Sequence, residues 1–204
     1  MIHEIRTYDL KPRSVPEFLE KTGAMLPGRL KYTPLGGFFH TEVGPLNQVV
    51  HIWPYDDMNH RAETRAKVIE DGVWPPDNAG IILNMQSEIY YPAPFMEPLG
   101  PRKIGPLFEL RIYTYASGDV PKVMAAWGDA IGERVKFSPL VGAWYSDIGG
   151  LNKWAHMWAY ESFEHRMSVR EETRAKGVWP PSSPVSPLKQ ENKLLWAADF
   201  SPIQ

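Results

Sequence analysis

Acidic, basic and phenolic side chains recur at every second position in two short segments of the chain. Each segment has the pattern Glu-x-Arg-x-Tyr, and the residues are Glu4, Arg6, Tyr8, Glu109, Arg111 and Tyr113. Residues two positions apart on a β-strand share one face, so each triplet would line one surface. The planar guanidinium suits a carboxylate or a developing oxyanion, but the neighbouring glutamate could equally hold it in a structural ion pair. The pattern is therefore typical of either an anion site or an architectural charge pair.

A second alternating pattern, His-x-Trp-x-Tyr, supplies groups for proton transfer and for lining a pocket. It also occurs twice, with the residues His51, Trp53, Tyr55, His156, Trp158 and Tyr160. Histidine titrates near neutral pH and is a common general acid or base, although a hydrogen-bonded core histidine is an equally ordinary role. The candidate catalytic residues are therefore His51, His156, Arg6 and Arg111. The candidate substrate-binding residues, some of which could instead be core, are Glu4, Tyr8, Trp53, Tyr55, Glu109, Tyr113, Trp158 and Tyr160.

Several other kinds of site find no support. The chain has no cysteine, which excludes disulfides and thiol catalysis, and it has no HExxH, GxSxG or glycine-rich phosphate motif. A haem would need an axial ligand such as His51 or His156, and no further ligand cluster accompanies either residue. We therefore expect no cofactor and no metal.

Both patterns return at one fixed spacing. Glu4 and Glu109 are 105 residues apart (109 minus 4), and the same offset relates the strings Gly-Val-Trp-Pro-Pro at 72–76 and 177–181 without a gap. Matching residues that keep one offset over so long a stretch indicate a duplication. We predict two repeats, at 1–91 and 108–204, joined by a Pro/Gly-rich linker at 92–107.

Each repeat is expected to form strand, helix, strand, strand, helix, strand. In the first copy the strands are predicted at 2–9, 36–43, 48–55 and 82–91, and the helices at 14–31 and 57–71. Ser14 and Glu17 resemble a capping box, and Asp57 and Ser162 are expected to cap the second helix of each repeat. This order is the ferredoxin-like βαββαβ unit.

The predicted fold class is α+β, with two tandem ferredoxin-like repeats. A ferredoxin-like sheet leaves one face without helices, so the two antiparallel sheets should face each other as an intrachain dimeric α+β barrel. The aliphatic strand faces, which include Ile5, Ile52 and Leu110, are expected to pack against the helices. The charged and aromatic faces are then expected to line a cavity between the sheets, with more room beside Val49 than beside its counterpart Trp154.

The second helices carry arginines four residues apart: Arg61, Arg65, Arg166 and Arg170. A solvated face balanced by nearby glutamates explains them most simply, and an anion site or a subunit contact is the alternative. The formal net charge of −2 gives no reason to expect nucleic acid or an anionic membrane as a partner. No apolar leader or membrane span is evident, so we expect a cytoplasmic protein with a small-molecule ligand, and a homo-oligomer is possible.

The combined motifs resemble the NIPSNAP domain, twice over. The matching features are Glu-x-Arg-x-Tyr, Gly44-x-x-Asn47 before His51-x-Trp53-x-Tyr55, the helix arginines and the following tryptophan. The resemblance implies membership of the dimeric α+β barrel superfamily. That superfamily contains cofactor-independent oxygenases, isomerases and lyases, haem enzymes, and binders without catalysis.

The sequence therefore supports two functional hypotheses. In the first, the protein binds and transforms a small carbonyl or aromatic compound by His/Arg/Tyr acid–base chemistry without a cofactor. In the second, the same fold serves as a non-catalytic ligand-binding or assembly protein.

Overall fold

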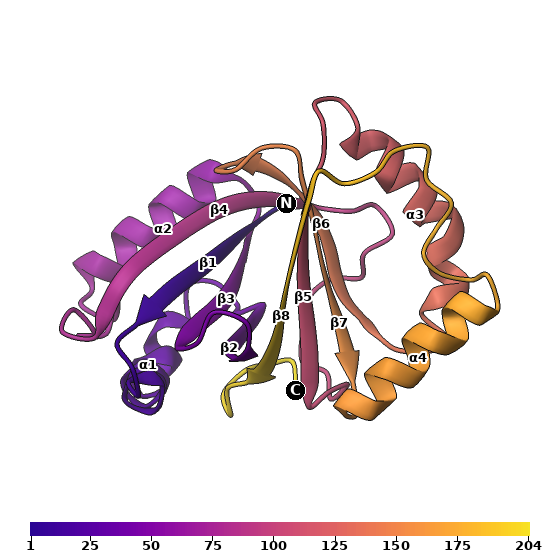
Figure 1. The fold of residues 1–204 in the computed structure, drawn as a ribbon. Helices are drawn as coiled ribbons and strands as arrows, with labels where there is room; N and C mark the ends of the chain where they lie inside the picture. Colours follow the sequence, from indigo (N-terminus) through magenta and orange to yellow (C-terminus); the bar gives the residue numbers. More distant parts are fainter.

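The alternating segments of both repeats form the strands of a single closed sheet in the computed structural model, which describes residues 1–204 (Figure 1). The first repeat comprises β1 (Ile2–Leu10), α1 (Val15–Arg29), β2 (Gly37–Val43), β3 (Gln48–Tyr55), α2 (Met58–Glu70) and β4 (Ile82–Pro92). The second comprises β5 (Leu107–Thr114), α3 (Val120–Arg134), β6 (Leu140–Ile148), β7 (Lys153–Tyr160), α4 (Phe163–Ala175) and β8 (Lys189–Ala197). The predicted elements are confirmed to within a few residues.

Each repeat contributes four antiparallel strands, and the two sheets join edge to edge. The strand order is β1-β3-β2-β8-β5-β7-β6-β4, closed on itself. Pairing of β2 with β8 and of β4 with β6 makes the two joins between the repeats. The helices lie outside the barrel, α1 and α2 over one half and α3 and α4 over the other (Figure 1). The intrachain α+β barrel expected from the duplication is therefore confirmed.

Aliphatic side chains from both repeats fill the interior of the barrel. One cluster of 14 buried residues joins Ile5, Val50 and Ile52 of the first repeat to Leu110 and Met157 of the second. This corrects the expected orientation, because these aliphatic faces meet across the barrel and do not pack against the helices. The charged and aromatic faces lie beneath the helices. Buried glutamates need partners, and arginines on the helices supply them.

Local capping confirms some of the expected helix boundaries. The side chain of Asp57 accepts hydrogen bonds from the backbone N–H groups of Asn59 and His60, and Ser162 accepts one from His165. Ser14 makes no side-chain capping bond, so the predicted capping box is wrong. Its backbone is already helical, whereas a capping residue usually has extended geometry.

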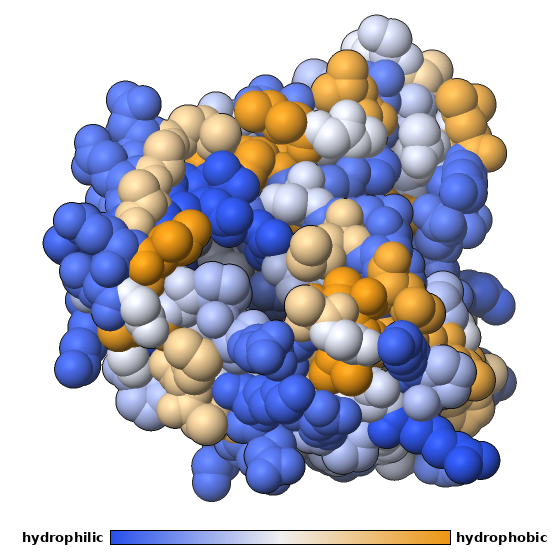
Figure 2. All heavy atoms as spheres, turned by 90° about the vertical axis from the view of Figure 1, so that its left-hand side faces the viewer, coloured by the Kyte–Doolittle hydropathy of each residue, from blue (hydrophilic) through white to orange (hydrophobic).

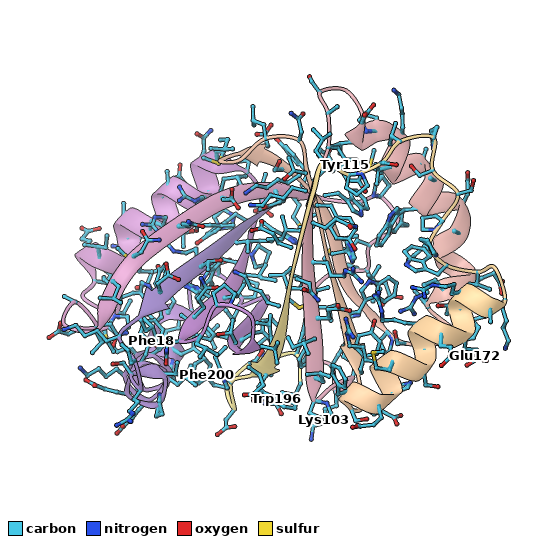
Figure 3. All side chains as sticks on the ribbon, viewed as in Figure 1. Phe18, Lys103, Tyr115, Glu172, Trp196 and Phe200 are labelled. Carbon is cyan, nitrogen blue, oxygen red and sulfur yellow. The ribbon has the colours of Figure 1, made fainter.

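Segments outside the regular elements tie the two halves together. Between the repeats, Met96, Leu99 and Ile104 pack against the barrel core. After β8 the chain returns to the first repeat, where Phe200 packs in the same cluster as Phe18 of α1 (Figure 3). None of the four helices combines the length and apolar character that crossing a bilayer requires.

Candidate functional site

Two pockets lie between the sheet and the helices, one in each repeat. The pocket of the second repeat has a volume of about 480 Å³, and that of the first about 220 Å³. All six predicted site residues of the first repeat line its pocket: Glu4, Arg6, Tyr8, His51, Trp53 and Tyr55. In the second repeat five line the pocket, and Glu109 is not among them: Arg111, Tyr113, His156, Trp158 and Tyr160. The predicted residues therefore gather as expected, but on the helix side of the sheet and not between the sheets.

The two repeats differ beside the strand histidines, and the larger pocket is additionally lined by residues of the segment 181–187. Phe38 stacks on His51 with ring centroids 4.9 Å apart, and the position 105 residues later is Ala143. Phe18 likewise corresponds to Val123. In the opposite direction, Trp127 replaces Thr22 and lines the larger pocket. The expectation of more room in the first repeat is wrong, because Val49 is fully buried in the core formed with α1.

Each strand histidine accepts a hydrogen bond from its neighbouring tryptophan. The indole Nε1 of Trp53 donates to Nδ1 of His51 at 2.7 Å, and Trp158 donates to His156 at 3.0 Å. Burial, followed by repulsion from Arg6, lowers the pKa of His51 to about 3, and burial followed by repulsion from Arg111 lowers the pKa of His156 well below its usual value. Both rings are therefore neutral at physiological pH, and Nε2 carries the proton.

One oxygen of the buried glutamate of the first repeat, Oε1 of Glu4, has three partners, whereas its buried Oε2 has none. Glu4 is 2.7 Å from both Arg6 and Arg61 and accepts from Ser87 at 2.6 Å. Burial alone would raise the pKa of Glu4, but these partners outweigh burial and lower the pKa to about 2. Arg6 also donates from Nε to the hydroxyl of Tyr8 at 2.6 Å. In this repeat the Glu–Arg pair is an architectural feature.

The corresponding pair in the second repeat is looser. Glu109 is held by Arg166 at 2.6 Å and by Asn192 at 3.1 Å, whereas Arg111 lies 3.7 Å away. Nε of Arg111 is buried and has no hydrogen-bond partner. Arg111 lines the larger pocket and has fewer protein partners than Arg6, which bonds to both Glu4 and Tyr8.

Two buried arginines at the ends of α1 and α3 were not identified from the sequence. Arg29 and Arg134 are each 2% exposed. The guanidinium of Arg134 lies 3.9 Å from the ring centre of Trp158 and donates to the hydroxyls of Ser138 and Tyr160, but it pairs with no carboxylate. The one signal was an arginine repeated at the 105-residue offset beside an apolar helix stripe. A buried cation without a counter-ion is costly, which marks a place for an anion.

The second helices and the segments that follow them complete the pockets. Of the helix arginines considered in the sequence, Arg61 and Arg166 pair with the buried strand glutamates, and Arg65 and Arg170 line the two pockets. Arg174 also lines the larger pocket. Burial, followed by repulsion from Arg111, lowers the pKa of Arg170, which reflects the crowding of cations there. Trp179 covers one side, its ring 4.5 Å from that of Trp127.

Comparison with known proteins identifies relatives along the whole chain. The NIPSNAP family model matches twice, at residues 3–97 and 108–202. The human "Protein NipSnap homolog 3A" is 31% identical over 218 residues, covering 100% of this chain and 86% of its own length.

Solved structures share the fold. A candidate monooxygenase from Lactobacillus acidophilus is 13% identical and covers 97% of this chain and 93% of its own, with a TM-score of 0.63. One from Fusobacterium nucleatum is 10% identical and covers 97% and 92%, with a TM-score of 0.66. At such identities the likeness establishes the barrel fold alone.

Proposed function

This chain belongs to the NIPSNAP family, and we propose that it binds a small organic anion with an aromatic or carbonyl-containing body in the pocket of its second repeat. The observation that carries the proposal is the imbalance of charge. Four arginines line the pocket, and no acidic residue lines it: Arg111, Arg134, Arg170 and Arg174. Only Arg111 forms an ion pair, at 3.7 Å. A bound carboxylate would supply the missing negative charge.

The remaining lining residues suit the body of such a ligand. Trp127, Trp158 and Trp179 present aromatic surface, and their ring centroids lie within 6.1 Å of one another. The volume of about 480 Å³ lies within the range of about 300–1,000 Å³ common for small-molecule sites. Nε2 of His156 is a free donor for a carbonyl oxygen. An aromatic or keto acid combines these features.

The protonation states favour binding over acid–base catalysis. Burial moves the pKa of His156 well below its usual value and raises the pKa of Tyr113 and Tyr160 above theirs. An effective general base needs a pKa near the working pH. The site thus favours the non-catalytic alternative over His-based proton transfer.

A second candidate function uses the same donors without titrating them. Arg111 and the neutral His156 could stabilise an oxyanion that develops on a bound carbonyl, which is electrostatic catalysis without a cofactor. The unpaired atoms Nε of Arg111 and Nε2 of His156 favour this candidate. It requires a substrate with its own basic group to accept the proton, because the pocket has no suitable base.

Calorimetric titration with benzoate, phenylpyruvate and the uncharged methyl benzoate tests the proposal. We expect the two acids to bind and the ester to bind at least tenfold more weakly, because a charged hydrogen bond contributes about 1.5–3 kcal/mol. Arg111→Met should weaken binding of the acids by a similar factor. Arg6→Met is the matched control, since Arg6 is occupied by Glu4 and Tyr8. Equal affinity for acid and ester would refute an anion site.

A further inference from the structure

The first repeat also holds a cation that lacks a counter-ion. Arg29 is 2% exposed and lines the smaller pocket, and its side chain makes one hydrogen bond, from Nη2 to the hydroxyl of Tyr55 at 2.9 Å. Its Nη1 is buried and has no partner. The buried Nε2 of His51, on the same pocket, is likewise unpaired. Buried donors normally have an acceptor, which a ligand or an ordered water can supply here. Oε2 of Glu4, on the same pocket, is an unpaired acceptor.

The charge of this pocket is positive despite its glutamate. Arg6, Arg29 and Arg65 line it together with Glu4. Glu4 is already bonded to Arg6 and to Arg61, a fourth arginine. Arg65 lies 4.0 Å from Glu4, at the outer limit of an ion pair. The four guanidinium groups therefore exceed the single carboxylate, and the excess favours an anion.

Two exposed apolar side chains line this pocket where the second repeat has polar ones. Ile69 and Met85 line it and are 60% and 57% exposed. Their counterparts in the second repeat are Arg174 and Gln190, which line the larger pocket. Figure 2 faces the first repeat and shows a hollow with both hydrophilic and hydrophobic residues at its rim. Exposed apolar side chains above the buried Arg29 suit a ligand with two chemically different ends.

The size of the pocket indicates how much of the ligand lies inside. About 220 Å³ is below the range of about 300–1,000 Å³ that encloses a whole drug-sized molecule. We propose that the first repeat binds an amphiphilic anion, with a carboxylate or phosphate headgroup on Arg29 and Arg65 and an alkyl chain that leaves across Ile69 and Met85. The two repeats then serve different ligands, and this site does not depend on the function proposed for the second repeat.

The test is titration of the full chain with alkyl carboxylates and alkyl phosphates of four to ten carbons, below their micelle concentrations. Binding is followed by calorimetry and by the indole N–H resonances of the 15N-labelled tryptophans. We expect the resonances of Trp53 and Trp74, which line this pocket, to shift. Affinity should rise about two- to fourfold for each added methylene, since a buried CH2 contributes about 0.8 kcal/mol. The headgroup series shows whether carboxylate or phosphate is preferred.

Variants of exposed residues test the contacts of the alkyl chain and of the headgroup separately, without disturbing the core. The double variant Ile69→Arg, Met85→Gln introduces the side-chain types of the second repeat and should abolish the dependence on chain length. Arg65→Met should weaken every headgroup by about tenfold. Both variants should leave benzoate binding at the second repeat unchanged. The proposal would be overturned if neither the carboxylates nor the phosphates shift Trp53 and Trp74, or if the dependence on chain length survives the double variant.

Discussion

Trp158 donates its indole N–H to Nδ1 of His156 at 3.0 Å, and this contact defines the chemistry of the histidine. An accepting Nδ1 carries no proton, so the neutral ring must carry its proton on Nε2. Trp53 fixes His51 in the same way. Both histidines are therefore hydrogen-bond donors towards a ligand and poor proton acceptors.

The neutral histidines should make the fold sensitive to mild acid. The pKa of His51 is lowered to about 3, by burial first and then by Arg6, whereas an unfolded histidine titrates near 6.5. Between these values the unfolded chain binds more protons, so stability is fully present above about pH 6.5 and falls as the pH decreases.

The size of this effect can be measured by urea unfolding between pH 5 and 6.5. A fully titrating histidine contributes a slope of about 1.4 kcal/mol per pH unit to the free energy of unfolding. We expect His51→Gln to remove one such contribution, because glutamine can still accept from Trp53 but does not titrate. The window avoids Glu4, whose folded pKa of about 2 affects stability below about pH 4.5. An unchanged slope in the variant would count against the buried neutral histidine.

Arg6 and its counterpart Arg111 should differ in how much each contributes to the stability of the protein. Arg6 bonds to Glu4 at 2.7 Å and to Tyr8 at 2.6 Å. Arg6→Met should cost about 2–3 kcal/mol, less than the 3–5 kcal/mol of a fully broken buried pair, because Glu4 keeps Arg61.

Arg111→Met should cost less than about 1 kcal/mol, because Glu109 retains Arg166 at 2.6 Å and Arg111 itself is 3.7 Å away. Chemical denaturation without ligand measures both variants. Equal destabilisation by the two substitutions would show that Arg111 has the same structural role as Arg6.

The helix and strand positions were predictable because two periodicities dominate the sequence. Alternation defined β1 and β3, and apolar residues at helical spacing defined α1. The face that meets the helices was not predictable from alternation alone, which shows only that two faces differ. The helices decide it: Arg61 reaches Glu4, and Arg29 lies 4.3 Å from the ring centre of Trp53.

The relative sizes of the two pockets also could not be predicted from the alternation of residues along the strands. They depend on residues of other elements: Phe38 of β2 stacks on His51, and Phe18 of α1 packs against Phe38. The prediction of more room in the first repeat compared only Val49 with Trp154 and did not take Phe18 and Phe38 into account. Phe18 and Phe38 differ from their counterparts Val123 and Ala143, so the signal was present in the repeat alignment.

This explanation predicts the cost of opening the first pocket. Phe38 is fully buried and stacks on His51. Phe38→Ala, which introduces the residue type found at Ala143, should destabilise the protein by about 3–5 kcal/mol, because the transfer and cavity terms both contribute. Thermal unfolding measures the loss. A loss below about 1 kcal/mol would mean that neighbouring side chains collapse into the space.

The last prediction concerns Trp179 as a cover for the larger pocket. Its ring is 4.5 Å from that of Trp127 and 5.7 Å from that of Trp158, and it is half-buried at the start of the proline-rich segment. Trp179→Ala should speed dissociation of a bound aromatic acid by about two- to tenfold, since an aromatic pair contributes about 0.5–1.5 kcal/mol beyond its buried area. The association rate should change little, because the arginines that attract the anion remain.

Stopped-flow displacement of the acid by excess competitor measures the release rate. Trp74→Ala is the matched control, because Trp74 covers the smaller pocket and lies 6.0 Å from Trp53 in the same arrangement. Release from the second repeat should be unaffected by Trp74→Ala and faster in Trp179→Ala. If both variants release the ligand at the wild-type rate, then Trp179 packs against the pocket without retaining its contents.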